Sequence, residues 1–145
     1  MAKFQAYRVQ WEHNRSLLAH IPSSHADWQV TIIFYAALQV IDTLLAYDNI
    51  SATSHDSRNA TLKQTNRYDK SWRHYAPLYD LSRKVRYLAD PAIWIKAEDI
   101  DVQVLRRFLY PIERSVATLT PNITWPAFAP IALRQVQATA TPGEH

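Results

Sequence analysis

The order of apolar and polar positions along the chain predicts a series of helices. Residues 3–20 place their large apolar side chains on one helical face, namely Phe4, Tyr7, Trp11 and Leu18. Residues 25–47 are apolar nearly all round, which is typical of a helix in the middle of a bundle. Between them Pro22 ends the first helix, and Ser24 with Asp27 predicts an N-terminal cap for the second.

A polar segment rich in Ser, Thr, Asn and Asp follows, and residues 48–57 are predicted to form a loop. A third helix is predicted to begin near Ser54 or Asp56 and to run to about Arg67 or Lys70. Its apolar periodicity is weak, so we expect this helix to be largely exposed or functional.

Prolines guide the prediction for the rest of the chain. Pro77 suits the first turn of a fourth helix, which an Asp-Pro pair at residues 90–91 ends. The apolar stripe of this helix consists of Leu78, Leu81, Val85 and Leu88. After a short apolar patch at residues 93–95, a fifth helix is predicted over about residues 99–119. Pro111 lacks a backbone N–H and is expected to kink it.

Together these elements predict an all-α fold, a bundle of four main helices plus a short fifth over residues 1–119. Residues 120–145 carry four prolines interleaved with Trp125 and Phe128, and we expect an extended C-terminal arm packed on a surface. Composition agrees with a helical fold, because the 145 residues include one glycine and no cysteine. Glycine-rich hairpins, glycine-rich phosphate loops, disulfides and thiolate metal sites are therefore disfavoured.

One stretch, residues 28–46, is apolar and long enough to be considered as a membrane span. It contains Asp42, and an aspartate in mid-span is costly in lipid, so we interpret the stretch as a buried central helix. Residues 1–8 lack the apolar region of a secretory signal. We expect a cytoplasmic protein with no membrane contact.

The net charge of +3 is concentrated in one segment. Residues 58–86 hold eight basic and two acidic side chains, whereas the segments on either side are slightly negative. Aromatic residues are interleaved with these cations, and single-stranded RNA needs both cations for phosphates and flat rings for bases. The candidate RNA-binding residues are Lys63, Arg67, Lys70, Trp72, Arg73, Arg83 and Arg86. The alternative is a solvated helix face whose aromatic rings turn into the core.

The junction between the polar loop and the third helix carries the densest candidate chemistry. His55 and Arg58 are three positions apart and share a helical face, with Asn59 one step beyond. Such a trio suits metal-independent RNA cleavage, with His55 as general acid or base, Arg58 holding the phosphate and Asn59 positioning it. The alternative is that Ser54 caps the helix and that His55 and Arg58 are ordinary surface residues.

Polar groups also follow one side of the second helix, where Tyr35, Gln39 and Asp42 lie at helical spacing. We interpret them as an interhelix hydrogen-bond network, or alternatively as the floor of a cleft below His55 and Arg58. No motif with metal-ligand spacing occurs, so we expect no metal and no cofactor.

Three stretches together resemble a subgroup of the HEPN superfamily over about residues 25–90. They are Phe34-Tyr35-Ala36-Ala37-Leu38 followed by Asp42, then Ser54-His55-x-x-Arg58-Asn59, and Leu81-Ser82-Arg83-x-x-Arg86-Tyr87. The resemblance implies a helical bundle, commonly a homodimer. Many members of that superfamily are metal-independent endoribonucleases of toxin–antitoxin or phage-defence systems, and others are noncatalytic RNA-binding or adaptor modules.

The superfamily's catalytic motif is an arginine and a histidine with four to six residues between them, the first of which is usually polar. Arg58 and Asn59 resemble its first half, but residues 63–65 hold no histidine where one is due. Arg67 and His74 have the right spacing within the basic segment and form the alternative catalytic pair.

Two functions from the resemblance therefore stay open. The first is an RNA-engaging protein, acting as a metal-independent endoribonuclease. The alternative is a noncatalytic interaction subunit of a defence complex. Gln39 favours this alternative, because relatives tend to have histidine at that position and glutamine cannot act as an acid or base. A small-molecule binder with a pocket in the bundle core is a third.

Overall fold

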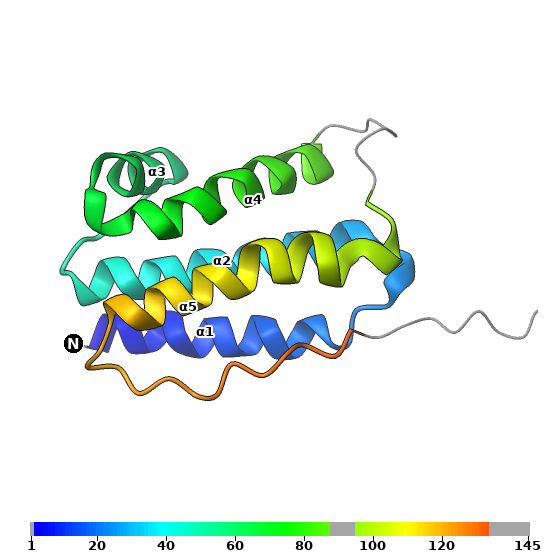
Figure 1. The fold of residues 1–145 in the computed structure, drawn as a ribbon, viewed down its shortest axis with the longest axis horizontal. Coiled ribbons are helices and arrows are strands. Elements are labelled where there is room, and N and C mark those ends of the chain that lie inside the picture. The colour runs from blue at the N-terminus through cyan, green and yellow to red at the C-terminus, as the bar shows by residue number, and fades with distance from the viewer. Residues whose placement is uncertain (1, 88–94, 134–145) are drawn as a thin grey trace, which may run out of the picture.

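The computed structural model describes residues 2–87 and 95–133, and all regular structure in these ranges is helical (Figure 1). The α-helices are α1 (Ala2–Leu18), α2 (Ala26–Tyr47), α3 (His55–Gln64), α4 (Asp69–Tyr87) and α5 (Tyr110–Leu119). A π-helix, Asp101–Leu109, leads directly into α5, and short 3-10 turns occur at Ser23–His25, Asn66–Tyr68 and Ala97–Asp99. The predicted all-α class is confirmed.

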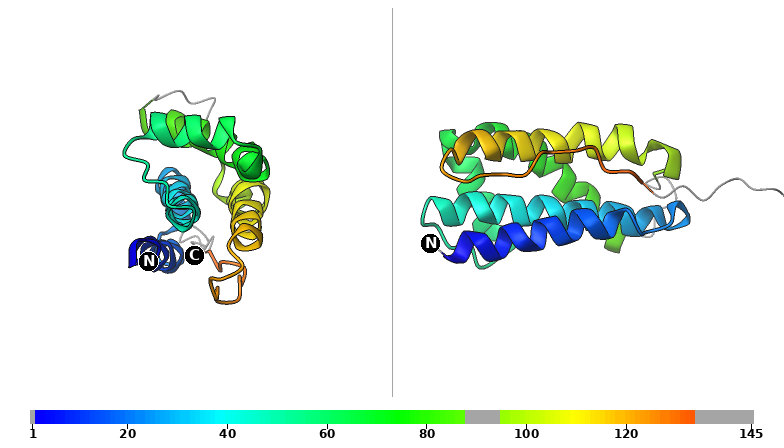
Figure 2. Two further views of the ribbon diagram at one scale, coloured as in Figure 1. Left: turned by 90° about the vertical axis from the view of Figure 1, so that its left-hand side faces the viewer. Right: turned by 90° about the horizontal axis from the view of Figure 1, so that it is seen from below.

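Helix α2 forms the centre of the bundle, as its apolar sequence predicts. It packs against α1, α4 and α5, and α3 lies crosswise to the long helices (Figures 1 and 2). Residues Ser23–Tyr47 are long and apolar enough to cross a membrane, and 72% of their most apolar window is buried inside the protein. The packing partners of α2 are therefore the amphipathic faces of the neighbouring helices.

The two predicted N-terminal caps behave differently. Ser54 caps α3, because its Oγ accepts the backbone N–H of Ser57 at 3.1 Å, and the Ser57 hydroxyl accepts the N–H of Ser54 in return. The cap predicted from Ser24 and Asp27 is wrong. The side chain of Ser24 instead lies 3.0 Å from Nδ1 of His25, and α2 begins without a side-chain cap.

The boundary between the third and fourth helices also differs from the prediction. Helix α3 ends at Gln64, and α4 begins at Asp69 rather than near Pro77, which lies inside α4. Tyr68 explains the break, because its ring is buried and the chain turns around it. Pro77 is exposed, as is Arg73, the residue four positions earlier whose carbonyl loses its helical partner. Residues 88–94, with the predicted end of this helix, lie outside the described part.

At Pro111 the structure shows a change of hydrogen-bond pattern within a continuous helical segment. The N–H of Tyr110 bonds to the carbonyl of Leu105, five residues back, and Pro111 then stands in the first turn of α5. A proline is tolerated there because first-turn N–H groups need no helical partner. The wider π-type turns accommodate the residue that was expected to produce a kink.

After α5 the chain has no regular structure as far as residue 133, and it runs back along the bundle (Figures 1 and 2). The rings of Trp125 and Phe128 pack edge-on against Trp11 of α1, with centroids 5.2 and 5.8 Å away. Arg15 pairs with the buried Glu113 at 2.7 Å and also donates to the carbonyl of residue 129. These contacts join α1, α5 and the C-terminal segment. Residues 134–145 of the predicted arm lie outside the described part.

Candidate functional site

Arg58, the predicted phosphate-binding residue, is buried in an ion pair. Its side chain extends from α3 to α2, where Nε donates to Oδ1 of Asp42 at 2.7 Å and Nη2 donates to Oδ2 at 3.1 Å. Arg58 is only 7% exposed and Asp42 8%. Burial raises the pKa of Asp42, and the hydrogen bonds and charge of Arg58 oppose that rise. The guanidinium is thus directed into the bundle rather than toward solvent.

His55 lies one turn before Arg58 and is held by it. Nη1 of Arg58 is 3.4 Å from Nδ1 of His55, and a guanidinium can only donate, so Nδ1 accepts and the proton of the neutral ring is on Nε2. The ring packs beside those of Phe34 and Tyr79. Burial lowers the pKa of His55, and the positive charges of Arg58 and Arg86 lower it further. The neutral ring therefore has an N–H donor at Nε2, and its lone pair at Nδ1 is occupied by Arg58.

The remaining polar groups near this ion pair are either buried without a hydrogen-bond partner in the described part of the chain or bonded to another helix. Tyr75 is fully buried, its hydroxyl has no hydrogen-bond partner among the described residues, and burial raises its pKa. The side-chain oxygen of Asn59 is likewise buried without such a partner. Tyr35 accepts a hydrogen bond from Arg86 at 2.9 Å. With Asp42 bound to Arg58, two of the three polar groups predicted along the second helix take part in interhelix hydrogen bonds.

The basic segment of the sequence separates onto different faces of α4. Arg86 packs over the rings of Phe34 and Tyr35, and Arg83 over Tyr79, on the side of α4 that faces α3 and α2. Trp72 shares this side and is part of the core packing. Lys63 is exposed on α3. Lys70 and His74 lie on the other side of α4, which faces α5.

That second side borders a groove of about 650 Å³ between the first turns of α4 and one face of α5. Four of the lining side chains are basic and one is acidic. The groove is lined by Asn66, Arg67, Asp69, Lys70, Arg73, His74, Pro111, Arg114, Ser115, Thr118 and Leu119. We call it the α4–α5 groove. Arg67, Lys70, Arg73 and His74 of the predicted sites thus lie together.

Two of the groove cations are ion-paired. Arg67 contacts Asp48 through Nε at 2.8 Å and Nη2 at 3.0 Å, and Nη2 also donates to the carbonyl of Leu119 at 2.7 Å. Tyr68 donates to the same carboxylate, and burial together with this bond raises its pKa to about 12. Arg73 pairs with Asp69 at 2.7 Å. Lys70 and Arg114 form no ion pair with any described residue, so the groove carries uncompensated positive charge.

His74 has the opposite tautomer to His55. Its Nδ1 lies 3.0 Å from the carbonyl oxygen of Lys70, and because a carbonyl can only accept, Nδ1 carries the proton. In the neutral ring Nε2 is then the nitrogen with the free lone pair. Of the two predicted catalytic histidines, His74 is therefore the one whose neutral ring offers a base at Nε2.

Arg114 is the groove residue that the sequence analysis missed. It lies in a segment of slightly negative net charge, and its position opposite Lys70 arises from the packing of α5 on α4. A polar position three residues after Pro111 on an amphipathic helix was the only signal available. Among the described residues there is no cluster of three or more potential metal-binding His, Cys, Asp or Glu side chains.

Comparison with known protein families, curated proteins and solved structures finds no match to this chain.

Proposed function

We propose that this chain is a HEPN-like RNA-engaging protein that binds a single strand along the α4–α5 groove. The observation that carries the proposal is the set of four basic side chains on one groove, of which Lys70 and Arg114 have no described acidic partner. Exposed cations bind phosphates by releasing condensed counterions, which gives affinity without sequence preference. Three of the basic residues come from the segment that the sequence marks as unusually positive.

Within this proposal, metal-independent cleavage takes place at Arg67 and His74, the alternative catalytic pair of the sequence analysis. Nε2 of His74 takes the proton of a ribose 2′-hydroxyl as that oxygen attacks the adjacent phosphorus. The bond from phosphorus to the 5′-oxygen breaks, and the imidazolium returns the proton to the leaving oxygen. The products are a 2′,3′-cyclic phosphate and a 5′-hydroxyl, and groove cations balance the charge on the phosphorane.

His55, Arg58 and Asn59 carry no step in this reaction. Arg58 is committed to Asp42, and the neutral His55 ring directs its lone pair at a guanidinium. We assign the three residues to the stability of the contact between α3 and α2.

Binding is tested with a short fluorescent single-stranded RNA by anisotropy over a range of salt concentrations. The charge-reversal variant Lys70→Glu/Arg114→Glu is expected to lose at least about 10-fold in affinity, and its salt slope falls by roughly 0.7 for each phosphate contact removed. The matched control Lys63→Glu/Arg83→Glu changes the net charge equally at two exposed residues, on α3 and α4, that do not line the groove. Equal losses in both variants contradict a groove-specific site.

Cleavage is tested separately, in EDTA, with mass analysis of the product ends. The expected result is cyclic phosphate formation that disappears in His74→Ala and persists in His55→Ala. Cleavage that is lost in His55→Ala and retained in His74→Ala would instead support His55, Arg58 and Asn59 as the catalytic residues. Salt-dependent binding without cleavage identifies the noncatalytic form of the proposed protein.

A second function is favoured by an apolar depression elsewhere on the surface. It is lined by Leu17, Ile21, Pro22, His25, Trp28 and Ile32, and Trp28 is 57% exposed. Such a patch suits a noncatalytic interaction subunit of a toxin–antitoxin or defence complex, or a homodimer. Light scattering of the wild type and of Trp28→Ser tests it. A complex or dimer that dissociates in the variant, with no salt-sensitive RNA binding, favours this second function.

A further inference from the structure

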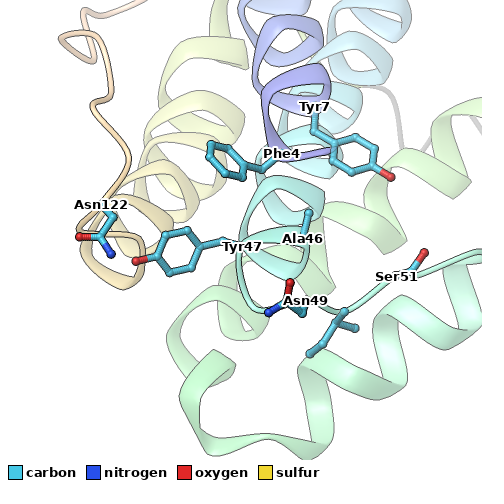
Figure 3. A pocket seen from close by; sticks show the side chains of 8 residues that line it. Phe4, Tyr7, Ala46, Tyr47, Asn49, Ser51 and Asn122 are labelled. Atoms are coloured by element: carbon cyan, nitrogen blue, oxygen red, sulfur yellow. The ribbon is translucent and has the colours of Figure 1, made fainter. Parts of the chain in front are cut away.

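A second hollow lies at the end of the bundle where α1 begins and α2 ends (Figure 3). Its volume is about 540 Å³, within the range of small-molecule sites. It is lined by Phe4, Tyr7, Ala46, Tyr47, Asn49, Ile50, Ser51 and Asn122, and none of these side chains is charged. We call it the end pocket. Its chemistry therefore differs from that of the basic α4–α5 groove.

The end pocket combines aromatic rings with unused amides. Phe4 and Tyr47 face each other edge-on with centroids 6.5 Å apart, and Tyr7 adds a third ring. Figure 3 shows the Tyr47 ring extending toward Asn122. The side-chain amides of Asn49 and Asn122 make no hydrogen bond to any described residue, so each offers two donors and one acceptor. Rings and amides together match the faces and edges of a nucleobase.

Asn49 has a backbone feature that fits this use. Within the described part of the chain, Asn49 is the one non-glycine residue with a positive φ. Its φ is 61°, and it lies in the turn that follows α2. The left-handed conformation is tolerated by asparagine better than by most residues, and it ends the helix so that residues 49–51 border the pocket.

The end pocket adjoins the α4–α5 groove through Arg67. The Arg67 guanidinium binds both Asp48, which precedes Asn49, and the carbonyl of Leu119, which lines the groove. Asn122 is three residues after Leu119, so their Cα atoms are at most about 11 Å apart. The junction made by Arg67 thus separates a cationic groove from an uncharged aromatic pocket.

We propose that the end pocket takes one unstacked nucleobase from the strand whose phosphates occupy the α4–α5 groove, an inference that rests on the proposed RNA binding. The base lies against the aromatic rings, and Asn49 and Asn122 bond its edge. Stacking serves any base, whereas the amides discriminate among donor and acceptor patterns, so the pocket gives the strand its register and a base preference.

The test is a scan in which a single abasic nucleotide is moved stepwise along a short RNA. Wild-type protein is expected to lose about 10-fold in affinity at one position and little at the others. The variant Asn49→Gly/Asn122→Ala removes both amides and keeps a residue that tolerates positive φ. It is expected to bind intact RNA more weakly, with a smaller further loss at that position. Gln103→Ala, an exposed amide on the π-helix, is the matched control.

The possible outcomes separate the two proposals. Salt-dependent binding that Lys70→Glu/Arg114→Glu removes, combined with equal affinity for every abasic RNA and an unaffected Asn49→Gly/Asn122→Ala variant, overturns the base pocket and keeps the groove. An absence of salt-dependent RNA binding by the wild type overturns both. A position-specific abasic loss that the amide variant abolishes supports the pocket.

Discussion

His55 of α3 and His74 of α4 lie beside opposite sides of α4, and the two histidines differ in what their rings can still do. On the side facing α3, Nδ1 of His55 accepts from Arg58 at 3.4 Å. On the side facing α5, Nδ1 of His74 donates to a backbone carbonyl at 3.0 Å. Because the partners differ, the two neutral rings have opposite tautomers. The partner of Nδ1 therefore decides which histidine offers a base.

The cations on the two sides differ in the same way. Arg58 is buried against Asp42, and a desolvated charge with a bidentate partner cannot exchange that partner for a phosphate without a large loss of stability. Lys70 and Arg114 are exposed, keep their hydration and have no described acidic partner. The burial and ion pairing of each basic side chain therefore indicate phosphate binding better than the number of basic residues in a segment does.

The largest expected effect comes from breaking the buried pair. Arg58→Ala leaves the Asp42 carboxylate buried and unpaired, so the free energy of unfolding is expected to fall by about 3–5 kcal/mol. Urea unfolding followed by circular dichroism measures it. Lys63→Ala, an exposed cation on the same helix, is the control and is expected to stay within about 0.5 kcal/mol.

A double variant sharpens this test. Replacing both charges, with Asp42→Leu and Arg58→Met, removes the need to bury an ion and is expected to recover much of the lost stability. RNA affinity of the folded fraction should match that of the wild type. Loss of affinity at unchanged stability in Arg58→Ala would instead make Arg58 a phosphate ligand.

The next effect concerns the cap that places His55 and Arg58. Ser54→Ala removes the acceptor for the N–H of Ser57, and a decrease of about 1 kcal/mol in the free energy of unfolding is expected. Ser24→Ala is a matched control, since Ser24 has the sequence of a cap but bonds only His25. Equal losses by urea unfolding in the two variants would contradict the assignment of a cap to Ser54 alone.

The fold was predictable where burial sets the pattern. The central helix α2 extends over Ala26–Tyr47, close to its predicted range, because a helix buried on all sides is apolar on all sides. The start of α4 was not predictable from Pro77, since a proline on an exposed face is tolerated inside a helix held by tertiary packing. The buried ring of Tyr68 sets that boundary, and one aromatic in a basic segment does not reveal its burial.

The candidate site was predictable only in part, for a related reason. Arg67, Lys70, Arg73 and His74 lie on one groove because they are close in sequence. Arg114 joins them through the packing of α5, which local spacing does not encode. The pairing of Arg58 with Asp42 across 16 positions likewise depends on where α3 crosses α2. A cation and an anion far apart in sequence give no signal that they will pair.

A smaller effect is expected for Arg67, which lies in the groove and is also ion-paired. Its pair with Asp48 is partly exposed, at 39% and 18%, so Arg67→Gln is expected to reduce the free energy of unfolding by about 1 kcal/mol or less. Arg73→Gln, whose pair with Asp69 is more exposed, should leave stability unchanged. Both variants are expected to lower RNA affinity to a similar extent in the anisotropy assay. An effect confined to stability would remove Arg67 from the binding surface.

The smallest effect is a pH dependence at His55. Its folded-state pKa is lowered from 6.5 by burial and by Arg58 and Arg86, while Asp42 and Asp56 act in the opposite direction. The unfolded chain therefore takes up a proton at a higher pH than the folded protein does. The resulting stabilisation is fully present above the unfolded pKa and is lost as the pH falls through 6.5 toward the folded value.

His55→Gln lacks this contribution, so its urea midpoint should fall less than that of the wild type between about pH 7.5 and about pH 5.5. Comparing the two proteins cancels the groups whose pKa does not depend on His55, including the buried Glu113, whose raised pKa acts with the opposite sign. Parallel curves for the two proteins would show that His55 takes up a proton without disturbing Arg58. In that case its Nδ1 is free of the guanidinium, and the distinction between the two histidines fails.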